Sequence, residues 1–279
     1  MTQVKATAIV AAIAILLLTA TGSSQSPPAL NRQRVTFKSG GLTLVGYLFR
    51  PDGPGPFPAV VWNHGSEKNP GGGPQFSTVA SIFVPAGYVV FAPMRRGHSD
   101  SEGEYITDAV ERETAQRGGR AGQQLAARLL ETSQLEDQLA GLAVLKQQPF
   151  VDTTRLVVAG CSYGGIQTLL GAERDAGYRA AVSISPAALS WAGNPDLRAR
   201  LKTAAARIRV PVFLIQPPKD ASLEPARVLG PELQRHNSKS RVRIYPAEGP
   251  ADEQGHCFGG ARGMHVWAAD VLAFLKKVM

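Results

Sequence analysis

The chain has 279 residues, of which 44% are hydrophobic, and this is enough to build one large core. Its formal net charge is +8, but the basic residues are dispersed and no nucleic-acid-binding motif accompanies them. We therefore expect a solvated basic surface and no nucleic-acid partner. The 2 cysteines are too few for a disulfide framework.

The first segment, residues 1–24, has the pattern of a secretory signal peptide. A nearly continuous apolar run over residues 6–20 follows Lys5 and leads to the small residues Gly22–Ser24, where cleavage is expected. The run is short for a bilayer span, so we expect export and no stable membrane span after processing. An uncleaved N-terminal membrane anchor is the alternative.

The rest of the chain predicts a linker and one domain. Residues 25–34 contain two prolines and are expected to form the linker, and residues 35–279 are expected to form the domain. The domain begins with residues 35–38 and 42–49, which alternate apolar with polar or small residues about a Gly40-Gly41 turn. This pattern is typical of an antiparallel hairpin.

Six further apolar runs predict short strands. They are residues 59–62, 88–91, 156–159, 180–184, 212–215 and 242–245. Helical patterns are found at residues 79–86, 135–147, 165–175, 225–236 and 264–278. This alternation indicates an α/β protein with a mostly parallel twisted sheet and helices on both faces. Longer stretches at about 99–133 and 186–209 are expected to be helical cap insertions over the site.

The segment Gly160-Cys161-Ser162-Tyr163-Gly164 lies between a predicted strand and a predicted helix. A strand that turns sharply into a helix exposes the hydroxyl of the central serine, and flanking glycines avoid collisions with the neighbouring backbone. Ser162 is therefore the candidate nucleophile. Cys161 is less suitable, because it would put Tyr163 where the turn tolerates no side chain. The alternative is a serine that only caps the helix.

A serine hydroxyl needs an imidazole to accept its proton and a carboxylate to orient that imidazole. In hydrolases built on a strand–helix turn, the acid and then the histidine follow the serine along the chain. Asp220, shortly after the predicted strand 212–215, is the leading acid, and a helix N-cap is its alternative role. His256, in a glycine-rich segment after the last predicted strand, is the expected base. This chemistry needs no metal and no organic cofactor.

Backbone N–H groups are expected to stabilise the tetrahedral intermediate of such a reaction. The expected donors are the N–H of Tyr163 and that of Ser66, which follows a predicted strand; Gly65 is the alternative donor in the same loop. Five further side chains follow strand ends and are candidates for the substrate pocket. They are His64, Arg95, Arg96, His98 and Tyr105.

Both cysteines lie beside candidate catalytic residues. Cys161 precedes Ser162, and Cys257 follows His256. We expect two unpaired and mostly buried thiols. A bridge between them in an oxidising compartment is the alternative.

Several segments together resemble the α/β-hydrolase superfamily, and within it the dienelactone hydrolase family and its prolyl-oligopeptidase-like relatives. These segments are His64-Gly65-Ser66, Arg95-Arg96-Gly97-His98, Gly160–Gly165, Asp220 and Gly255-His256-Cys257-Phe258. The resemblance extends from residue 35 or so to the C-terminus. It implies an α/β-hydrolase fold and hydrolysis of carboxylic esters or related acyl bonds in a small-molecule substrate.

Three features qualify this resemblance. Dienelactone hydrolase uses a cysteine nucleophile, whereas this chain has Ser162, so its substrate specificity is not carried over. The peptidase relatives leave an aminopeptidase-like or acyl-peptide hydrolase as the alternative enzyme. A fold does not fix a function, so a non-catalytic binding protein on a hydrolase scaffold is the alternative from another class.

Overall fold

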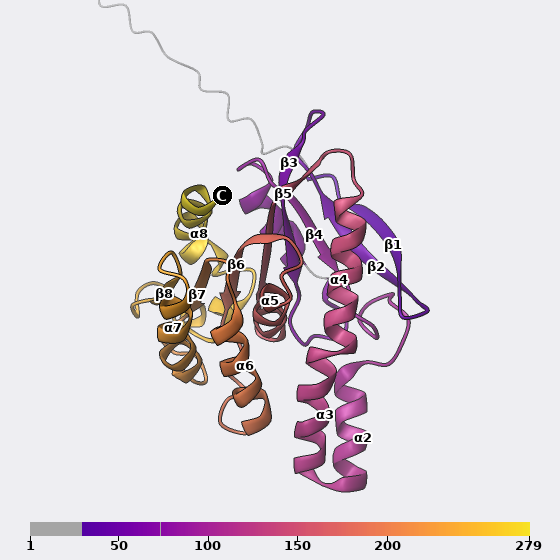
Figure 1. Ribbon diagram of the computed structural model, residues 1–279, viewed down its shortest axis with the longest axis vertical. Helices are drawn as coiled ribbons and strands as arrows, with labels where there is room; N and C mark the ends of the chain where they lie inside the picture. The colour runs from indigo at the N-terminus through magenta and orange to yellow at the C-terminus, as the bar shows by residue number, and fades with distance from the viewer. Residues whose placement is uncertain (1–29, 73) are drawn as a thin grey trace, which may run out of the picture.

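A twisted sheet of eight strands runs through the part of the protein that the computed structural model describes, residues 30–72 and 74–279 (Figure 1). The strands are β1 (Gln33–Ser39), β2 (Leu42–Phe49), β3 (Phe57–Asn63), β4 (Val89–Pro93), β5 (Val151–Cys161), β6 (Tyr178–Ile184), β7 (Val212–Gln216) and β8 (Arg241–Ile244). Their order is β1-β2-β4-β3-β5-β6-β7-β8. Pairing is antiparallel between β1 and β2 and between β2 and β4, and parallel from β4 to β8. The mostly parallel sheet that the sequence predicts is therefore present.

The β1–β2 hairpin forms the outer edge of the sheet. Its turn passes through Gly40 and Gly41, whose φ angles of 53° and 84° lie in the left-handed region that glycine adopts without steric cost. The first strand begins at Gln33, so Gln33 and Arg34, which were expected in the linker, belong to the sheet.

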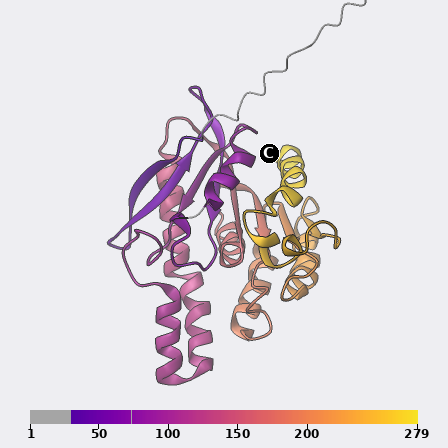
Figure 2. The ribbon, with the colours of Figure 1, turned by 180° about the vertical axis from the view of Figure 1, so that it is seen from behind.

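Helices cover both faces of this sheet (Figures 1 and 2). They are α1 (Gln75–Phe83), α2 (Ile106–Arg117), α3 (Gly119–Glu131), α4 (Ser133–Lys146), α5 (Tyr163–Glu173), α6 (Pro195–Arg207), α7 (Glu224–His236) and α8 (Met264–Val278). Helices α1 and α8 pack on the face that buries Val60 and Val182, and α4 to α7 pack on the face that buries Val61 and Val158. Since both faces are covered, the central strands are continuous apolar runs.

The first helix differs from its prediction. Residues 79–86 were expected to be helical, but α1 spans Gln75–Phe83. Pro85 has no N–H with which to continue the helical hydrogen bonds, and Gly87 turns the chain with a φ of 87°. A helix is therefore present as predicted, but it begins and ends earlier in the chain than expected.

The stretch 99–133 folds into the helical hairpin α2–α3, which projects beyond the body of the protein (Figures 1 and 2). Its inner part packs through α3 against α4 and α6. Small residues such as Ala126 and Ala127 are buried there and allow the helices to approach closely. The second stretch, 186–209, contributes α6 and the loop that precedes it.

Within residues 30–72 and 74–279, none of the helices has both the length and the apolar character that a bilayer span requires. The same residues contain no group of three or more His, Cys, Asp or Glu side chains arranged to hold a metal ion. The predicted signal peptide lies outside the described residues.

Candidate active site

Ser162 lies at a sharp turn between β5 and α5 with φ 60° and ψ −119°, a conformation that non-glycine residues seldom adopt. The glycines on either side permit it. A Cβ atom at Gly164 would lie 1.9 Å from the carbonyl oxygen of Asn63, and one at Gly160 would lie 2.5 Å from the same atom. The end of β3 therefore reaches the serine only because both positions lack a side chain.

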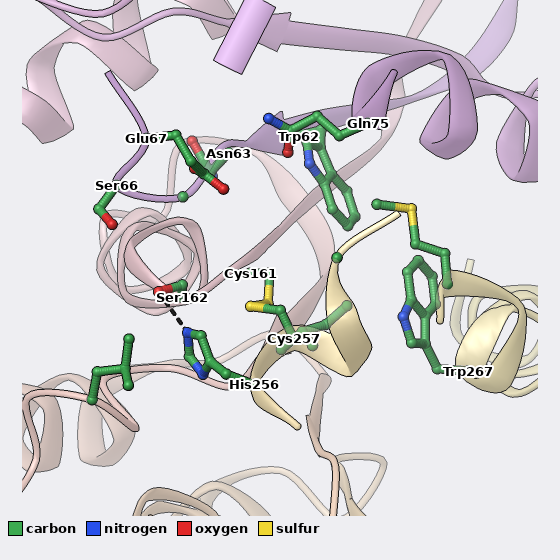
Figure 3. A pocket seen from close by; sticks show the side chains of 15 residues that line it. Trp62, Asn63, Ser66, Glu67, Gln75, Cys161, Ser162, His256, Cys257 and Trp267 are labelled. Atoms are coloured by element: carbon green, nitrogen blue, oxygen red, sulfur yellow. Dashed lines mark hydrogen bonds between the residues drawn. A yellow bond between two sulfur atoms is a disulfide. The ribbon is translucent and has the colours of Figure 1, made fainter. Parts of the chain in front are cut away.

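Three side chains that are distant in the sequence meet at this turn, and Figure 3 shows two of them, Ser162 and His256. The His256 Nε2 atom lies 2.9 Å from the Ser162 Oγ atom, and the His256 Nδ1 atom lies 2.7 Å from Asp220 Oδ1. In a neutral imidazole, Nδ1–H donates to the carboxylate and Nε2 accepts from the serine hydroxyl. The residues predicted as nucleophile, base and acid thus form one hydrogen-bonded chain.

Asp220 is held by the ends of two strands. Gln216, the last residue of β7, donates from Nε2 to Asp220 Oδ2 at 3.1 Å, and the Ser185 hydroxyl also binds the carboxylate. Burial opposes ionisation of Asp220, but its hydrogen bonds with His256, Ser185 and Gln216 outweigh burial and keep its pKa below the ordinary value. Asp220 is not the N-cap of α7, a position that Leu223 occupies.

Ser185 and Gln216 were not identified from the sequence. Both are fully buried polar residues at the carboxyl ends of apolar strand segments. A buried polar side chain at the end of a parallel strand faces the functional edge of such a sheet. This placement is the signal by which they could have been found.

The expected oxyanion donors lie near the serine. Tyr163 is the first residue of α5, so its N–H has no partner within the helix. Gly65 and Ser66 both line the cavity beside Ser162. In the described part of the chain, the N–H groups of Gly65 and Ser66 donate to no protein atom. The structure leaves both loop donors free.

A cavity of about 240 Å³ opens beside Ser162. Trp62, Met264 and Trp267 form much of its apolar wall, and the two indole rings are nearly parallel with centroids 6.1 Å apart (Figure 3). The cap insertions were expected to supply the pocket walls, and this is largely wrong. Among the described residues of these insertions, only Leu189 lines the cavity. The walls instead come mainly from β3 and the loop after it, α1, the Ser162 turn, the His256 segment and α8.

The five candidate pocket side chains lie elsewhere. None of His64, Arg95, Arg96, His98 and Tyr105 is among the residues that line the cavity. His64, His98 and Arg95 are buried, and Arg96 pairs with Asp137 at 2.8 Å. Their expected place in the pocket is therefore corrected: Arg95 and Tyr105 bind carbonyl groups of the loop that carries Ser66, and Arg96 binds Asp137 of α4.

Burial also fixes the charge state of two of these residues. Burial, followed by the charge of Arg95, lowers the pKa of His98 to about 3 and lowers that of His64 well below its ordinary value. Both imidazoles are neutral at physiological pH. They serve as uncharged packing and hydrogen-bonding groups.

The cysteines are bridged, which corrects the expectation of two free thiols. Cys161 and Cys257 form a disulfide with their Cα atoms 6.1 Å apart (Figure 3). The hydrogen bond between Ser162 and His256 brings their neighbours within the range that a disulfide requires. The bridge therefore joins the residue before the serine to the residue after the histidine.

The fold is that of the α/β-hydrolase class, and the arrangement of Ser162, His256 and Asp220 resembles the site of a serine hydrolase. The sequence model of the prolyl oligopeptidase family matches residues 74–194. A curated relative, the uncharacterized peptidase YtmA of Bacillus subtilis, is 26% identical over 163 residues, which are 58% of this chain and 51% of that protein. The alignment thus spans about half of the relative's length. The expected resemblance to prolyl-oligopeptidase-like serine hydrolases is confirmed.

Solved structures confirm the predicted fold. The esterase Pf2001 of Pyrococcus furiosus superposes with a TM-score of 0.66 at 18% identity, covering 90% of this chain and 94% of that chain. The acylaminoacyl peptidase of Pyrococcus horikoshii superposes with a TM-score of 0.64 at 17% identity, covering 90% of this chain and 42% of that chain. At these identities the likeness establishes the architecture and leaves the substrate open.

We predict that reduction of the disulfide destabilises the protein. The bridge closes a sequence separation of 96 residues. In the chain-entropy description, loss of such a bridge costs about 5 kcal/mol of unfolding free energy. Urea unfolding with and without reductant measures this loss, and the double variant Cys161→Ala/Cys257→Ala is the reductant-insensitive control. Two free thiols per chain in the oxidised protein would contradict the bridge.

We also predict a loss of stability in acid. The folded protein holds His98 with a pKa of about 3, whereas the unfolded chain titrates it near the ordinary 6.5. Between these values the unfolded chain binds more protons, so the unfolding free energy falls as pH falls, by about 2 kcal/mol from pH 7 to pH 5 for this histidine. His98→Asn should flatten the pH dependence measured by urea unfolding. His265→Asn, at an exposed histidine, is the control and should leave the dependence unchanged.

Proposed function

We propose that this protein hydrolyses carboxylic esters whose acyl group is short and either apolar or aromatic. The observation that carries the proposal is the hydrogen-bonded chain from Ser162 through His256 to Asp220. Dienelactone specificity is not part of the proposal, because the residue at the turn is a serine.

In the proposed reaction the Ser162 Oγ atom attacks the ester carbonyl carbon while His256 Nε2 accepts the hydroxyl proton. The tetrahedral intermediate collapses, the C–O bond to the alcohol breaks, and His256 returns the proton to the leaving oxygen. Water then attacks the acyl-enzyme by the same steps and releases the acid. Asp220, with its pKa below the ordinary value, remains ionised and stabilises the imidazolium.

The negative charge on the intermediate needs fixed donors. The N–H of Tyr163 at the start of α5 and the N–H of Ser66 are the proposed pair, with Gly65 as the alternative loop donor. The N-terminus of α5 adds the positive end of a helix dipole. Such preorganised donors commonly supply the largest single contribution to acyl transfer.

The cavity supports the substrate class. Its size of about 240 Å³ and the indole rings of Trp62 and Trp267 suit a compact apolar or aromatic acyl group. Leu189 lines the same cavity and is 68% exposed, so it offers an apolar contact at the mouth.

One observation favours a second function. Glu67 lines the cavity as well, and a carboxylate at this position would attract a substrate ammonium group. This favours an aminopeptidase-like hydrolase. An acyl-peptide hydrolase, whose substrate has no free ammonium group, is supported only by the fold shared with an acylaminoacyl peptidase. Peptide amides are therefore the competing substrates.

The proposal is tested with short p-nitrophenyl esters and matched peptide p-nitroanilides. We expect the esters to have the higher kcat/KM, and Ser162→Ala to lower kcat about 10⁴-fold or more, because no other group can form the acyl-enzyme. Asp220→Asn should lower kcat about 10³-fold or more, because it favours the wrong imidazole tautomer.

The outcomes separate the candidates. A preference for the anilides would replace the ester hydrolase with the peptidase. Full esterase activity in Ser162→Ala would exclude the proposed mechanism. Failure of a fluorophosphonate to label Ser162 in the wild-type protein would instead favour the non-catalytic binding protein.

We further propose that the protein is exported. The apolar run of residues 6–20 after Lys5 supports this, and a disulfide is stable in an oxidising compartment. N-terminal sequencing of the protein from its source cells should find a first residue shortly after Gly22–Ser24. Recovery of the uncleaved chain in the membrane fraction would support the N-terminal anchor instead.

A further inference from the structure

The loop that follows β3 is held by its carbonyl oxygens. Arg95 donates from Nη1 to the carbonyl oxygen of His64 at 2.9 Å and from Nη2 to that of Gly65 at 2.7 Å. The hydroxyl of Tyr105 donates to the carbonyl oxygen of Ser66. Three successive carbonyl groups are therefore bound by side chains from the segment that follows β4.

The directions of these carbonyl groups also fix the directions of the N–H groups that follow them. In a trans peptide the C=O and the following N–H point in opposite directions. A carbonyl of Gly65 that faces Arg95 turns the N–H of Ser66 away from Arg95, and the carbonyl of His64 does the same for the N–H of Gly65. Arg95 and Tyr105 are absent from the cavity wall, whereas Gly65 and Ser66 line it.

The free N–H groups fit this arrangement. Among the described residues, the N–H groups of Gly65 and Ser66 have no protein acceptor. A backbone donor without a partner beside a cavity is available to a ligand. The carbonyl contacts thus leave two donors on the side of the loop where the substrate carbonyl would lie.

Arg95 is an unusual residue for a purely structural contact. It is 1% exposed, and among the described residues no carboxylate lies within ion-pair distance, although Asp137 and Glu67 are near enough to raise its pKa. Besides the loop carbonyls, its Nε atom donates to Gln134 Oε1 at 3.1 Å. Burial lowers its pKa to about 10, so the guanidinium remains charged at neutral pH. A buried cation without an ion-pair partner is costly, and here its hydrogen bonds go mainly to one loop.

The surrounding side chains fix this arrangement further. The neutral imidazole of His64 accepts the backbone N–H of Arg95 at Nε2, at 3.2 Å, and donates from Nδ1 to the carbonyl oxygen of Gly65 at 2.9 Å. The ring of Tyr105 packs edge-on against His98 with centroids 5.0 Å apart, and His98 contacts the His64 ring. The carbonyl of Gly65 is therefore bound from two sides.

We propose that Arg95 and Tyr105 are positioning residues for the oxyanion hole, holding the carbonyl oxygens of residues 64–66 so that the N–H of Ser66 faces the carbonyl under attack. This rests on the proposed function. The positive charge behind the loop also polarises its peptides, which strengthens the N–H groups as donors to a developing negative charge.

The test variant is Tyr105→Phe, which removes one hydroxyl and keeps the ring that packs on His98. We expect kcat for the best p-nitrophenyl ester to fall about 10-fold with KM within about twofold, because positioned donors act mainly in the transition state. The affinity for a trifluoromethyl ketone, which forms a tetrahedral adduct with the serine, should fall by the same factor. Binding of the carboxylic acid product should be unchanged.

Matched variants separate positioning from folding. Tyr178→Phe removes another buried tyrosine hydroxyl, which accepts from Gln138 at 3.3 Å away from the site, and should leave kcat unchanged. Arg95→Lys keeps the charge but loses the fork that binds two carbonyls, and should reduce kcat more than Tyr105→Phe does. Thermal unfolding of each variant establishes that the protein measured is folded.

Two results would overturn the proposal. An unchanged kcat in a folded Tyr105→Phe would do so, and so would a loss of kcat without a parallel loss of trifluoromethyl ketone affinity. If the wild-type protein is active and its Ser162 is labelled by a fluorophosphonate, either of these results leaves the proposed function intact. A wild-type protein that cleaves neither ester nor amide would overturn the proposed function and the positioning role together.

Discussion

The close approach of β3 to the turn around Ser162 is the constraint on which the site depends. The carbonyl oxygen of Asn63 occupies space that a side chain at Gly160 or Gly164 would need. Because the two backbones touch, the loop after β3 begins beside the serine, and its N–H groups lie within reach of a group bound there. This packing contact sets where the loop begins, and the contacts of Arg95 and Tyr105 with the loop carbonyls set which way its N–H groups point.

The polar side chains around this contact lie in two places, beside the cavity and behind the loop that follows β3. Ser162 and His256 line the cavity, with the Asp220 side chain buried behind the histidine, while Arg95 and His64 lie behind the loop. Neutral imidazoles behind the loop avoid a second buried positive charge next to Arg95. The low polarity of the surroundings makes each remaining hydrogen bond stronger than it would be in water.

The sequence predicted those parts of the site whose chemistry is tied to chain order. Ser162, Asp220 and His256 could be identified because each follows a predicted strand in the order that the reaction geometry requires. The sheet could be predicted because strands buried on both faces are apolar without interruption. These signals come from short segments of the chain, so they can be recognised in a single sequence.

The remaining features of the site depend on the directions in which helices and side chains point, and these could not be predicted from a single sequence. The α2–α3 hairpin projects from the body instead of covering the cavity, because α3 packs on α4 and α6. Arg95 follows a strand end, as a pocket residue would, but its side chain turns inward to the loop carbonyls. The pairing of the cysteines required knowledge that the two segments converge.

That pairing has a topological consequence. Ser162, Asp220 and His256 all lie between Cys161 and Cys257, so the disulfide closes a covalent ring that contains every member of the hydrogen-bonded chain. A single proteolytic cut in any surface loop within the ring opens it without releasing a fragment. The nicked molecule still carries the alcohol, the imidazole and the carboxylate on one connected polymer.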